Sequence, residues 1–502
     1  MTNLIIAPVL VPLGAGVLLI LLGDRGIGWR RGLGLLSVVV QVLLAIALLD
    51  VTAGGAIPTH ALGNWPAPFG IVLVADRLAA WMLLITALLA LFTLWHACQG
   101  LDLQGRHFHV LFQLQLFGLN GAFLTGDLFN LFVFFEVLLL ASYGLALHGG
   151  GAARTQAGLH YVVINLAGSA LFLIAAGLLY GLFGTLNLAH LALLMTQTPV
   201  ENLGPARTAV LLLFGVFALK AALLPLHLWL PATYGRASAP VAALFAIMTK
   251  VGAYAILRVA TLMLGDAAPG FAGLYQDWLL PLALVTLLAG MVGALGSRCL
   301  TDQAAYLVIA SVGTLLVAWG LGGRDAIAAG LYYLPHSTFA AAALFLLTDR
   351  IAQGRGELAD RFEPAPDVPN APLVGSLFFV CAILLAGLPP LSGFIGKFLL
   401  LRAALAYPSW PWVLGIVLVS GLLGLLALAR SGSLLFFRLA AVPRAVAVAL
   451  GARPVSLAPA IGLLILTLIL TLWAGTWLEV TTGIADQLLQ PRAYIQAVLG
   501  TR

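Results

Sequence analysis

The sequence predicts an all-α, polytopic membrane protein of about fourteen transmembrane helices, and two observations lead to this fold class. Of the 502 residues, 62% are apolar and only 8% are charged, whereas a soluble domain is roughly 25% charged. The apolar residues form continuous runs of about 20 residues, long enough to cross a bilayer as helices, and not the period-two alternation of an outer-membrane barrel. This composition excludes a soluble globular enzyme, a disordered chain and a coiled coil.

The predicted spans follow one another with mostly short connections. The first, Leu4 to Leu22, has no basic n-region and no cleavage pattern, so we expect a retained helix rather than a signal peptide. In chain order the spans cover residues 4–23, 31–53, 76–98, 107–125, 128–147, 157–182, 207–229, 239–263, 278–297, 304–322, 325–348, 371–406, 409–430 and 455–478. Of the longer connections, 54–75 could form a small outer hairpin, and Leu186–Met195 could lie along the outer interface.

The placement of arginine predicts how the chain is oriented. Most Arg residues fall in the odd-numbered loops, and the even-numbered loops hold Arg77, Arg207, Arg324 and Arg402. Because positively charged residues concentrate in cytoplasmic loops, the odd-numbered loops are predicted to be cytoplasmic and both termini to lie outside.

Two spans contain backbone breakers. Span seven holds Pro225, and span twelve holds the run Gly-Leu-Pro-Pro-Leu-Ser-Gly at 387–393. Irregular backbone at membrane depth persists only where protein or a water-filled cavity satisfies it. Breaks five spans apart suggest two inverted five-helix repeats, spans 4–8 and 9–13, as in secondary transporters. The predicted organisation is therefore 1–106 for the first three helices, 107–263 and 278–430 for the repeats, and 431–502 for the last helix and tail.

Ionisable residues inside the spans are the strongest functional signal. They are Glu136, Lys220, Lys250, His336 and Lys397, and they include every lysine of the chain. Lys250 and His336 each lie about 16 Å along their spans, near the middle of a core about 30 Å thick. A buried Lys can gain and lose a proton, whereas Arg keeps its proton, so the set predicts a proton path. For any single member, a fixed structural pair remains an alternative.

Other polar residues have simpler interpretations. Arg258 is predicted to snorkel at the outer interface. His227, just past the Pro225 break, could be a point of proton access from the cytoplasm or an interface residue. Asp127 precedes span five and is expected to cap it. His107 and His109 form an H-x-H near span four, but the sequence offers no carboxylate or Cys support for a metal there.

The sequence contains no signature of a redox cofactor or of nucleic-acid binding. Cys98, Cys299 and Cys381 lie far apart and share no metal or disulfide spacing, and motifs for haem, iron–sulfur clusters or nucleotide phosphates are missing. The Arg residues are scattered singly rather than in a basic stripe. We therefore expect no cofactor and no enzymatic activity, with transport driven by an ion gradient or by partner subunits.

Four sequence segments resemble one transporter family. Residues 125–137, TGDLFNLFVFFEV, resemble the span-five motif of the D subunit of the Mrp (also Pha) monovalent cation/proton antiporters. Residues 220–231, with 239–241 and 250–254, are similar to its spans seven and eight, and 387–397 to its broken span twelve. The patterns of spans seven and twelve are shared with the antiporter-like subunits of respiratory complex I.

The resemblance implies a function and a partner set. It implies a fourteen-helix subunit of a hetero-oligomeric complex in a bacterial inner membrane, which exchanges protons for Na⁺ or K⁺ together with other antiporter subunits. It also implies that Glu136 pairs with Lys220, that Lys250 is the central proton carrier, that His336 is a relay, and that Lys397 is the terminal carrier.

The sequence departs from the family after His336. Many relatives carry a Lys five residues further on, where this chain has Ala341. The relay is therefore expected to depend on His336 and water, helped by Ser337 or Thr338.

Two rival functions remain open. One is a proton-pumping subunit of a complex I-like NADH/quinone or hydrogenase assembly, against which the long span-five motif argues. The other is a membrane scaffold without conduction, against which the buried lysines argue.

Overall fold

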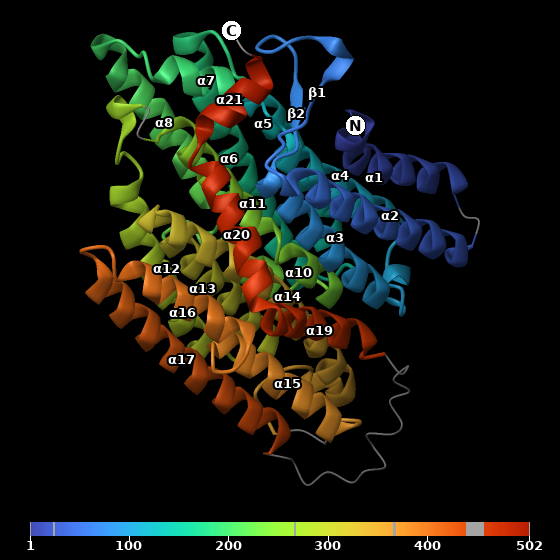
Figure 1. Cartoon of the computed structure of the whole chain (residues 1–502). Helices are drawn as coiled ribbons and strands as arrows, with labels where there is room; N and C mark the ends of the chain where they lie inside the picture. The colour runs from blue at the N-terminus through green and yellow to red at the C-terminus, as the bar shows by residue number, and fades with distance from the viewer. Residues whose placement is uncertain (1, 24–25, 266–267, 365–367, 438–455, 501–502) are drawn as a thin grey trace.

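The computed structural model of the chain describes residues 2–23, 26–265, 268–364, 368–437 and 456–500 (Figure 1). Its described part is a bundle of helices with one two-stranded sheet, which confirms the predicted all-α membrane class. Helices α1 to α4 gather on one side, α12, α13 and α15 to α17 on the other, and α14 lies between the two groups. Four arginines of the orientation prediction, Arg25, Arg438, Arg444 and Arg453, lie outside the described residues, so the orientation stays a prediction.

The helices of the first half largely follow the predicted spans. They are α1 Thr2–Leu22, α2 Ile27–Ala53, α3 Arg77–Ala97, α4 Phe108–Leu124, α5 Leu128–Ala146, α6 Ala152–Phe183, α7 Leu188–Met195, α8 Val200–Lys220, α9 Trp229–Tyr234, α10 Ala239–Phe245 and α11 Met248–Met263.

The second half continues in the same way. Its helices are α12 Gln276–Gly296, α13 Leu300–Leu321, α14 Arg324–Arg355, α15 Ala371–Ala386, α16 Ser392–Ala404, α17 Trp410–Phe436, α19 Ala458–Leu472, α20 Ala474–Leu488 and α21 Pro491–Leu499. Short 3₁₀ helices are η1 Leu62–Asn64, η2 Leu101–Leu103, η3 Pro269–Phe271 and η4 Gly356–Leu358.

Not every predicted span is a single long helix. Within the described residues, 11 helices are long and apolar enough to cross a membrane, or up to 12 if the bent pair α19–α20 is one span. Helices α4 and α15 are apolar but shorter. The count of fourteen, the two inverted repeats and the proposed domain limits therefore stay predictions.

Both predicted breaks are present, and neighbouring side chains satisfy their backbone. Helix α8 ends at Lys220, and Trp229 Nε1 donates to the Leu219 oxygen at 3.1 Å, while Leu224 N donates to Thr286 Oγ1 at 2.9 Å. Helix α15 ends at Ala386, and α16 resumes only at Ser392. Protein groups thus satisfy part of the irregular backbone, as an apolar surrounding requires, although Pro225, Pro389 and Pro390 themselves are exposed.

The sequence did not indicate two further interruptions. A short non-helical step separates α10 from α11, although the two pass together as one span. Helices α19 and α20 meet at an angle of 84°, whereas the sequence predicts one span over 455–478.

The small elements between the long helices match their expectations in type. Strand β1, Thr59–Ala61, pairs with β2, Val72–Val74, in an antiparallel hairpin with His60 opposite Leu73. The apolar piece after residue 186 forms α7, whose position relative to a membrane stays a prediction. Asp127 caps α5 as expected, because its carboxylate accepts a 2.8 Å hydrogen bond from Asn130 N.

Burial separates a central group of helices from a peripheral one. The apolar segments of α10–α11 and α14 are wholly buried, whereas a third of those in α2 and α17 are. Helices buried all round belong to the centre of a membrane bundle. Lys250 and His336 lie on these central helices, so the fold places both far from the lipid-facing surface.

Candidate functional site

Lys250 is fully enclosed on α11, and its partner is neutral. Its relative exposure is 0%, and Nζ donates a 3.2 Å hydrogen bond to Ser311 Oγ on α13. Ser311 in turn donates to the Val308 oxygen at 2.7 Å. Within the described part of the chain no carboxylate lies within ion-pair distance of Lys250, so this ammonium has no fixed counter-charge.

Glu136 and Lys220 are close in the fold but not directly paired. Lys220 Nζ donates a 3.0 Å hydrogen bond to Asn165 Oδ1, and Ser169 Oγ donates to Glu136 Oε1. Asn165 and Ser169 both belong to α6, which contacts α5 and α8. The direct pair that the resemblance implies is not among the ion pairs of the described residues, although Glu136 still acts electrostatically on Lys220.

Helix α11 approaches the end of α8 very closely. A Cβ on Gly252 would lie 2.4 Å from the Ala221 nitrogen, so only glycine permits this contact. Gly252 follows Lys250 by two residues, and the contact therefore brings the α11 segment that carries Lys250 against the backbone of Lys220.

A cavity of about 20 Å³ lies beside the same contact, lined by residues that include Tyr161, Asn165, Lys220, Met248 and Val251. A water molecule needs a cavity of at least about 10–15 Å³ and polar partners. The cavity therefore has room for one water between Lys220 and the helix that carries Lys250.

His336 is tied to the break of span twelve. It is 1% exposed, and its Nδ1 lies 2.9 Å from Ser392 Oγ, at the start of α16. The expected helpers Ser337 and Thr338 do not contact the imidazole, because both hydroxyls donate to the Leu334 oxygen of their own helix. Ser392, rather than Ser337 or Thr338, is therefore the hydrogen-bond partner of the imidazole, and the part of Ser337 and Thr338 in the relay stays a prediction.

Pro335 lies inside α14, directly before His336. Pro335 has no N–H to offer the carbonyl one turn earlier, and the freed Leu331 oxygen accepts instead from Trp81 Nε1 at 3.2 Å. The helix therefore stays continuous at His336 without leaving a buried carbonyl unsatisfied.

Lys397 is held by the end of a helix. Its Nζ donates to the Ala386 oxygen at 2.9 Å, and the Leu385 oxygen lies at 3.5 Å, both in the last turn of α15. Free carbonyls and the negative end of the helix dipole favour a cation at this position. Lys250 and Lys397 both lie near enough to His336 to act on it electrostatically.

His227 lies in the irregular segment between α8 and α9. It is half-buried, and its Nδ1 has no hydrogen-bond partner among the described residues. Its role in proton access stays a prediction.

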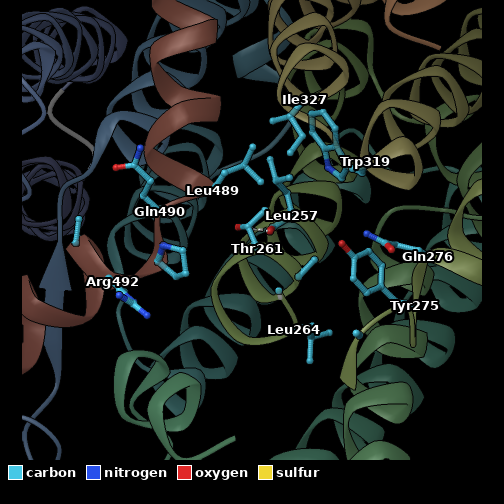
Figure 2. A pocket seen from close by; sticks show the side chains of 17 residues that line it. Leu257, Thr261, Leu264, Tyr275, Gln276, Trp319, Ile327, Leu489, Gln490 and Arg492 are labelled. Atoms are coloured by element: carbon cyan, nitrogen blue, oxygen red, sulfur yellow. Dashed lines mark hydrogen bonds between the residues drawn. The ribbon is translucent and has the colours of Figure 1, made fainter. Parts of the chain in front are cut away.

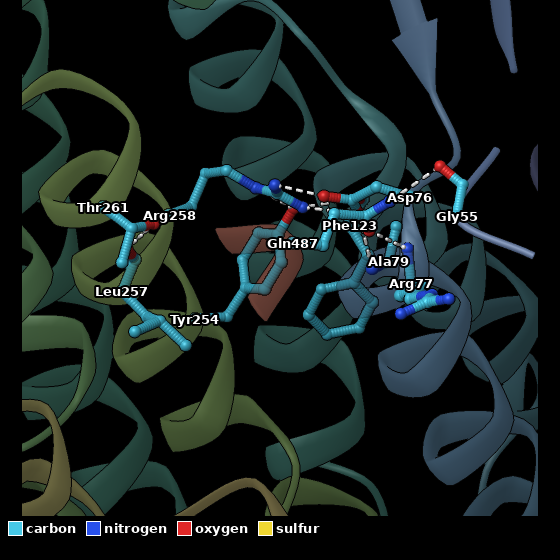
Figure 3. A network of polar contacts seen from close by, with 10 residues as sticks. All are labelled: Gly55, Asp76, Arg77, Ala79, Phe123, Tyr254, Leu257, Arg258, Thr261 and Gln487. Atoms are coloured by element: carbon cyan, nitrogen blue, oxygen red, sulfur yellow. Dashed lines mark hydrogen bonds and ion pairs between the residues drawn. The ribbon is translucent and has the colours of Figure 1, made fainter. Parts of the chain in front are cut away.

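Arg258 contradicts its expectation, because it does not snorkel. It is 5% exposed and forms a bidentate ion pair with Asp76, including a 2.7 Å bond from Nη2 to Oδ1 (Figure 3). Its guanidinium also lies over the rings of Tyr254 and Tyr494, at 5.4 and 5.3 Å from their centroids. The sequence analysis missed the partner because Asp76 lies 182 residues away, at the N-cap of α3.

The environment of His109 also differs from the expectation. Asp102 Oδ2 lies 3.0 Å from His109 Nε2, and Cys98 is close enough to complete a possible three-ligand group within 4.8 Å. Carboxylate and Cys support therefore exist, which corrects the sequence interpretation. However, Arg31 donates to both oxygens of Asp102, at 2.7 and 2.8 Å, so the carboxylate already has a cationic partner.

The environment of Asp102 lowers the pKa of its carboxyl group. Burial alone would raise its pKa, but hydrogen bonds from Arg31 and His109 lower the pKa of this carboxyl to about 2. The Arg31–Asp102–His109 cluster therefore behaves as a fixed ion-pair network joining α2, η2 and α4.

A larger cavity of about 600 Å³ opens near the far end of α11 (Figure 2). Leu257, Trp319 and Leu489 supply apolar walls, and Gln276 and Arg492 supply polar groups. Trp319 Nε1 also donates to the Ala253 oxygen at 2.9 Å, one turn from Lys250.

The sequence analysis missed the neutral partners of the charged residues: Asn165, Ser169, Ser311 and Ser392. The four-residue spacing of Asn165 and Ser169 in an otherwise apolar span is a signal that could have found the first two. Ser311 and Ser392 carry no comparable signal, because single serines are common in membrane helices.

Comparison with known proteins gives consistent matches. Residues 125–424 match the family described as NADH:quinone oxidoreductase/Mrp antiporter, TM. The chain is 40% identical to the D subunit of a probable K(+)/H(+) antiporter of Rhizobium meliloti (strain 1021), over 99% of this chain and 97% of the relative. It is 36% identical to the D subunit of the Na(+)/H(+) antiporter of Alkalihalophilus pseudofirmus, over 99% and 100%. A chain in the structure of the Mrp complex from a Dietzia species matches with a TM-score of 0.89 and 30% identity, and 100% of both chains is covered.

Proposed function

Because this chain belongs to the NADH:quinone oxidoreductase/Mrp antiporter transmembrane family, we propose that it is the proton-translocating subunit of a multisubunit monovalent cation/proton antiporter. In this role it moves protons in exchange for Na⁺ or K⁺, as a secondary transporter subunit rather than an enzyme. The names of the two relatives, both D subunits of a cation/proton antiporter, support this choice.

The observation that carries the proposal is the buried Lys250, whose ammonium rests on the neutral Ser311 hydroxyl. An ion pair would leave an uncompensated buried carboxylate when its Lys lost the proton, which is costly. A neutral acceptor removes that penalty, so Lys250 can release and regain a proton in place.

The proposed path runs through the five ionisable residues of the spans. Glu136 and Lys220 begin it, Lys250 is the central carrier, His336 is the relay and Lys397 is the terminal carrier. His227 is the candidate point of proton entry, and an interface residue is its alternative role. The electrostatic coupling of His336 to the lysines on both sides supports this order.

We further propose a membrane location and a set of partners. We place the protein in a bacterial inner membrane, multi-pass, with both termini on the outer side and with other antiporter subunits and lipid around it. Large apolar side chains such as Leu36 and Trp412 are exposed on α2 and α17, at 60% and 72%, which suits contact with lipid or with neighbouring subunits.

A second candidate function is a proton-pumping subunit of a complex I-like NADH/quinone or hydrogenase assembly. The description of the matched family also names NADH:quinone oxidoreductase, and this supports the alternative. Co-purification of the chain with quinone- or hydrogen-linked redox subunits would favour it, whereas co-purification with small membrane subunits would favour the antiporter.

The test uses everted vesicles that contain the whole complex. Adding Na⁺ or K⁺ to vesicles with a preformed pH gradient should dissipate that gradient, and Lys250→Ala should abolish the response at equal complex content. Lys250→Arg should be equally inactive, because Arg keeps the charge but does not release its proton. Thr261→Ala, further along α11, is the matched control and should retain exchange. Wild-type exchange per complex in Lys250→Ala would contradict the proposal.

A further inference from the structure

Two neutral residues of α6 stand between the charged groups that begin the proposed path. Asn165 accepts the hydrogen bond of the Lys220 ammonium, and Ser169 donates to the Glu136 carboxylate. Residues four apart share one face of a helix and lie about 6 Å apart along its axis. The two charged groups are therefore held on successive turns of the same helix face.

The geometry points to Asn165 and Ser169 as positioning residues of the proton relay. They hold Lys220 and Glu136 apart in this conformation, and the relay step moves the Lys220 ammonium from Asn165 to Glu136. This inference rests on the proposed function and adds the neutral side chains that determine when the charged pair forms.

In the separated arrangement, Lys220 and Glu136 each have a hydrogen-bond partner. A buried charge without a polar partner is costly, but the buried Lys220 and the partly buried Glu136 each have one. The bond of an ammonium to a neutral amide is weaker than an ion pair in a low-dielectric interior. Asn165 can thus hold Lys220 and still release it, so two arrangements of similar free energy are available, as a switch requires.

The Asn165 amide is itself oriented toward Lys220. Its Nδ2 donates a 2.9 Å hydrogen bond to the Tyr161 oxygen one turn earlier. This bond fixes the amide plane and leaves Oδ1 for Lys220. A residue that only stabilised the packing of α6 against α8 would also make these contacts. The experiment therefore has to distinguish a positioning role from a structural one.

The surroundings of Lys220 include few other titratable groups. On the described elements that pack against it, Glu136 of α5 and Tyr161 of α6 face it, and α11 brings Lys250 close to the end of α8. The Tyr161 hydroxyl is hydrogen-bonded to the Ser142 hydroxyl at 2.8 Å. Glu136 is therefore the one acidic partner that Lys220 gains by leaving Asn165.

The first experiment measures the pH dependence of exchange per assembled complex. Asn165→Leu removes the competing acceptor, so Lys220 stays with Glu136 and holds its proton to higher pH. On the acidic side of the pH profile, the midpoint of the rise in exchange activity should shift to a higher pH by about one unit. This is the size of effect expected from one charged hydrogen bond. Ser169→Ala should move the midpoint in the same direction, and Asn165→Thr, which keeps an acceptor oxygen, should move it less.

Asn120→Leu is the matched control. Asn120 is also a buried amide that joins helices, with bonds of 2.7 Å to the Pro8 oxygen and 3.0 Å to Gln41 Oε1, and among the described residues its side chain is hydrogen-bonded to no ionisable group. It should lower the amount of complex without moving the pH profile. A profile of Asn165→Leu that coincides with those of wild type and Asn120→Leu would overturn the inference.

A second measurement does not depend on transport. Infrared difference spectra between two pH values, with Glu136→Gln identifying the carboxylate band, should show a shifted Glu136 band in Asn165→Leu and in Ser169→Ala. An unchanged band in both variants would overturn the inference. If the wild-type complex exchanges neither Na⁺ nor K⁺, the proposed function fails, and the infrared result still decides the role of α6.

Discussion

The Nδ1 of His336 and the Oγ of Ser392 lie 2.9 Å apart and connect the middle of α14 to the first residue of α16. The imidazole therefore contacts the second half of the broken span through a neutral hydroxyl. A serine can either donate to or accept from the ring, so this contact tolerates both tautomers and the protonated form.

His336 is the one titratable side chain proposed between Lys250 and Lys397, so its removal should be severe. We expect His336→Ala to abolish most exchange, and Ala341→Lys in the same background to restore part of it by supplying a proton acceptor one turn away. Transport per assembled complex in everted vesicles checks this. A normal rate per complex in His336→Ala would remove the residue from the path, whereas a loss that only follows the protein level would indicate a structural histidine.

The charge of Glu136 should matter more than its length. Glu136→Gln removes the negative charge that stabilises the Lys220 ammonium, and we expect loss of exchange at neutral pH. Glu136→Asp keeps the charge with a shorter reach and should be milder. The comparison is made with Na⁺ or K⁺ pulses at matched complex content, and equal losses in the two variants would favour a purely geometric role.

Asp102 should stabilise the folded protein over the whole physiological pH range. Its pKa in the folded state is lowered from 3.8 to about 2, so its contribution is complete above the unfolded-state value and is lost as the pH falls toward 2. Asp102→Asn should therefore cost about 2 kcal/mol at pH 7, and thermal unfolding in detergent should show nearly the same loss at pH 6. Asp50→Asn, an exposed carboxylate on α2, is the control and should have little effect; a loss of the same size would point to net charge instead.

The Arg258–Asp76 pair should behave as a buried ion pair. Arg258→Met leaves the Asp76 carboxylate buried without a partner, and we expect destabilisation of about 3–5 kcal/mol. The double variant Arg258→Met/Asp76→Asn should recover much of this loss. Detergent unfolding curves of the three proteins measure it, and additive losses in the double variant would show that the two side chains act independently.

The sequence predicted those features that depend on local chain properties. The apolar runs indicated the helices, Pro225 and the 387–393 run indicated the breaks, and Asp127 indicated a cap. The sequence did not predict features that depend on contacts between distant helices. Asp76 as the partner of Arg258, Asp102 beside His109, and Ser392 beside His336 all come from segments whose packing order no local pattern encodes. The sequence did not predict the bend between α19 and α20 either, because the residues next to it on both sides are apolar.

The contact of Lys397 with the Ala386 oxygen has a consequence for protein engineering. The ligand is a main-chain atom, so replacing the Ala386 side chain would leave it in place, and an alanine scan would report no partner for this lysine. The sensitive position is the next residue, Gly387, whose φ is +78° and where a Cβ would lie 2.9 Å from Nζ. A substitution at Gly387 is thus expected to displace Lys397 without changing any ionisable group.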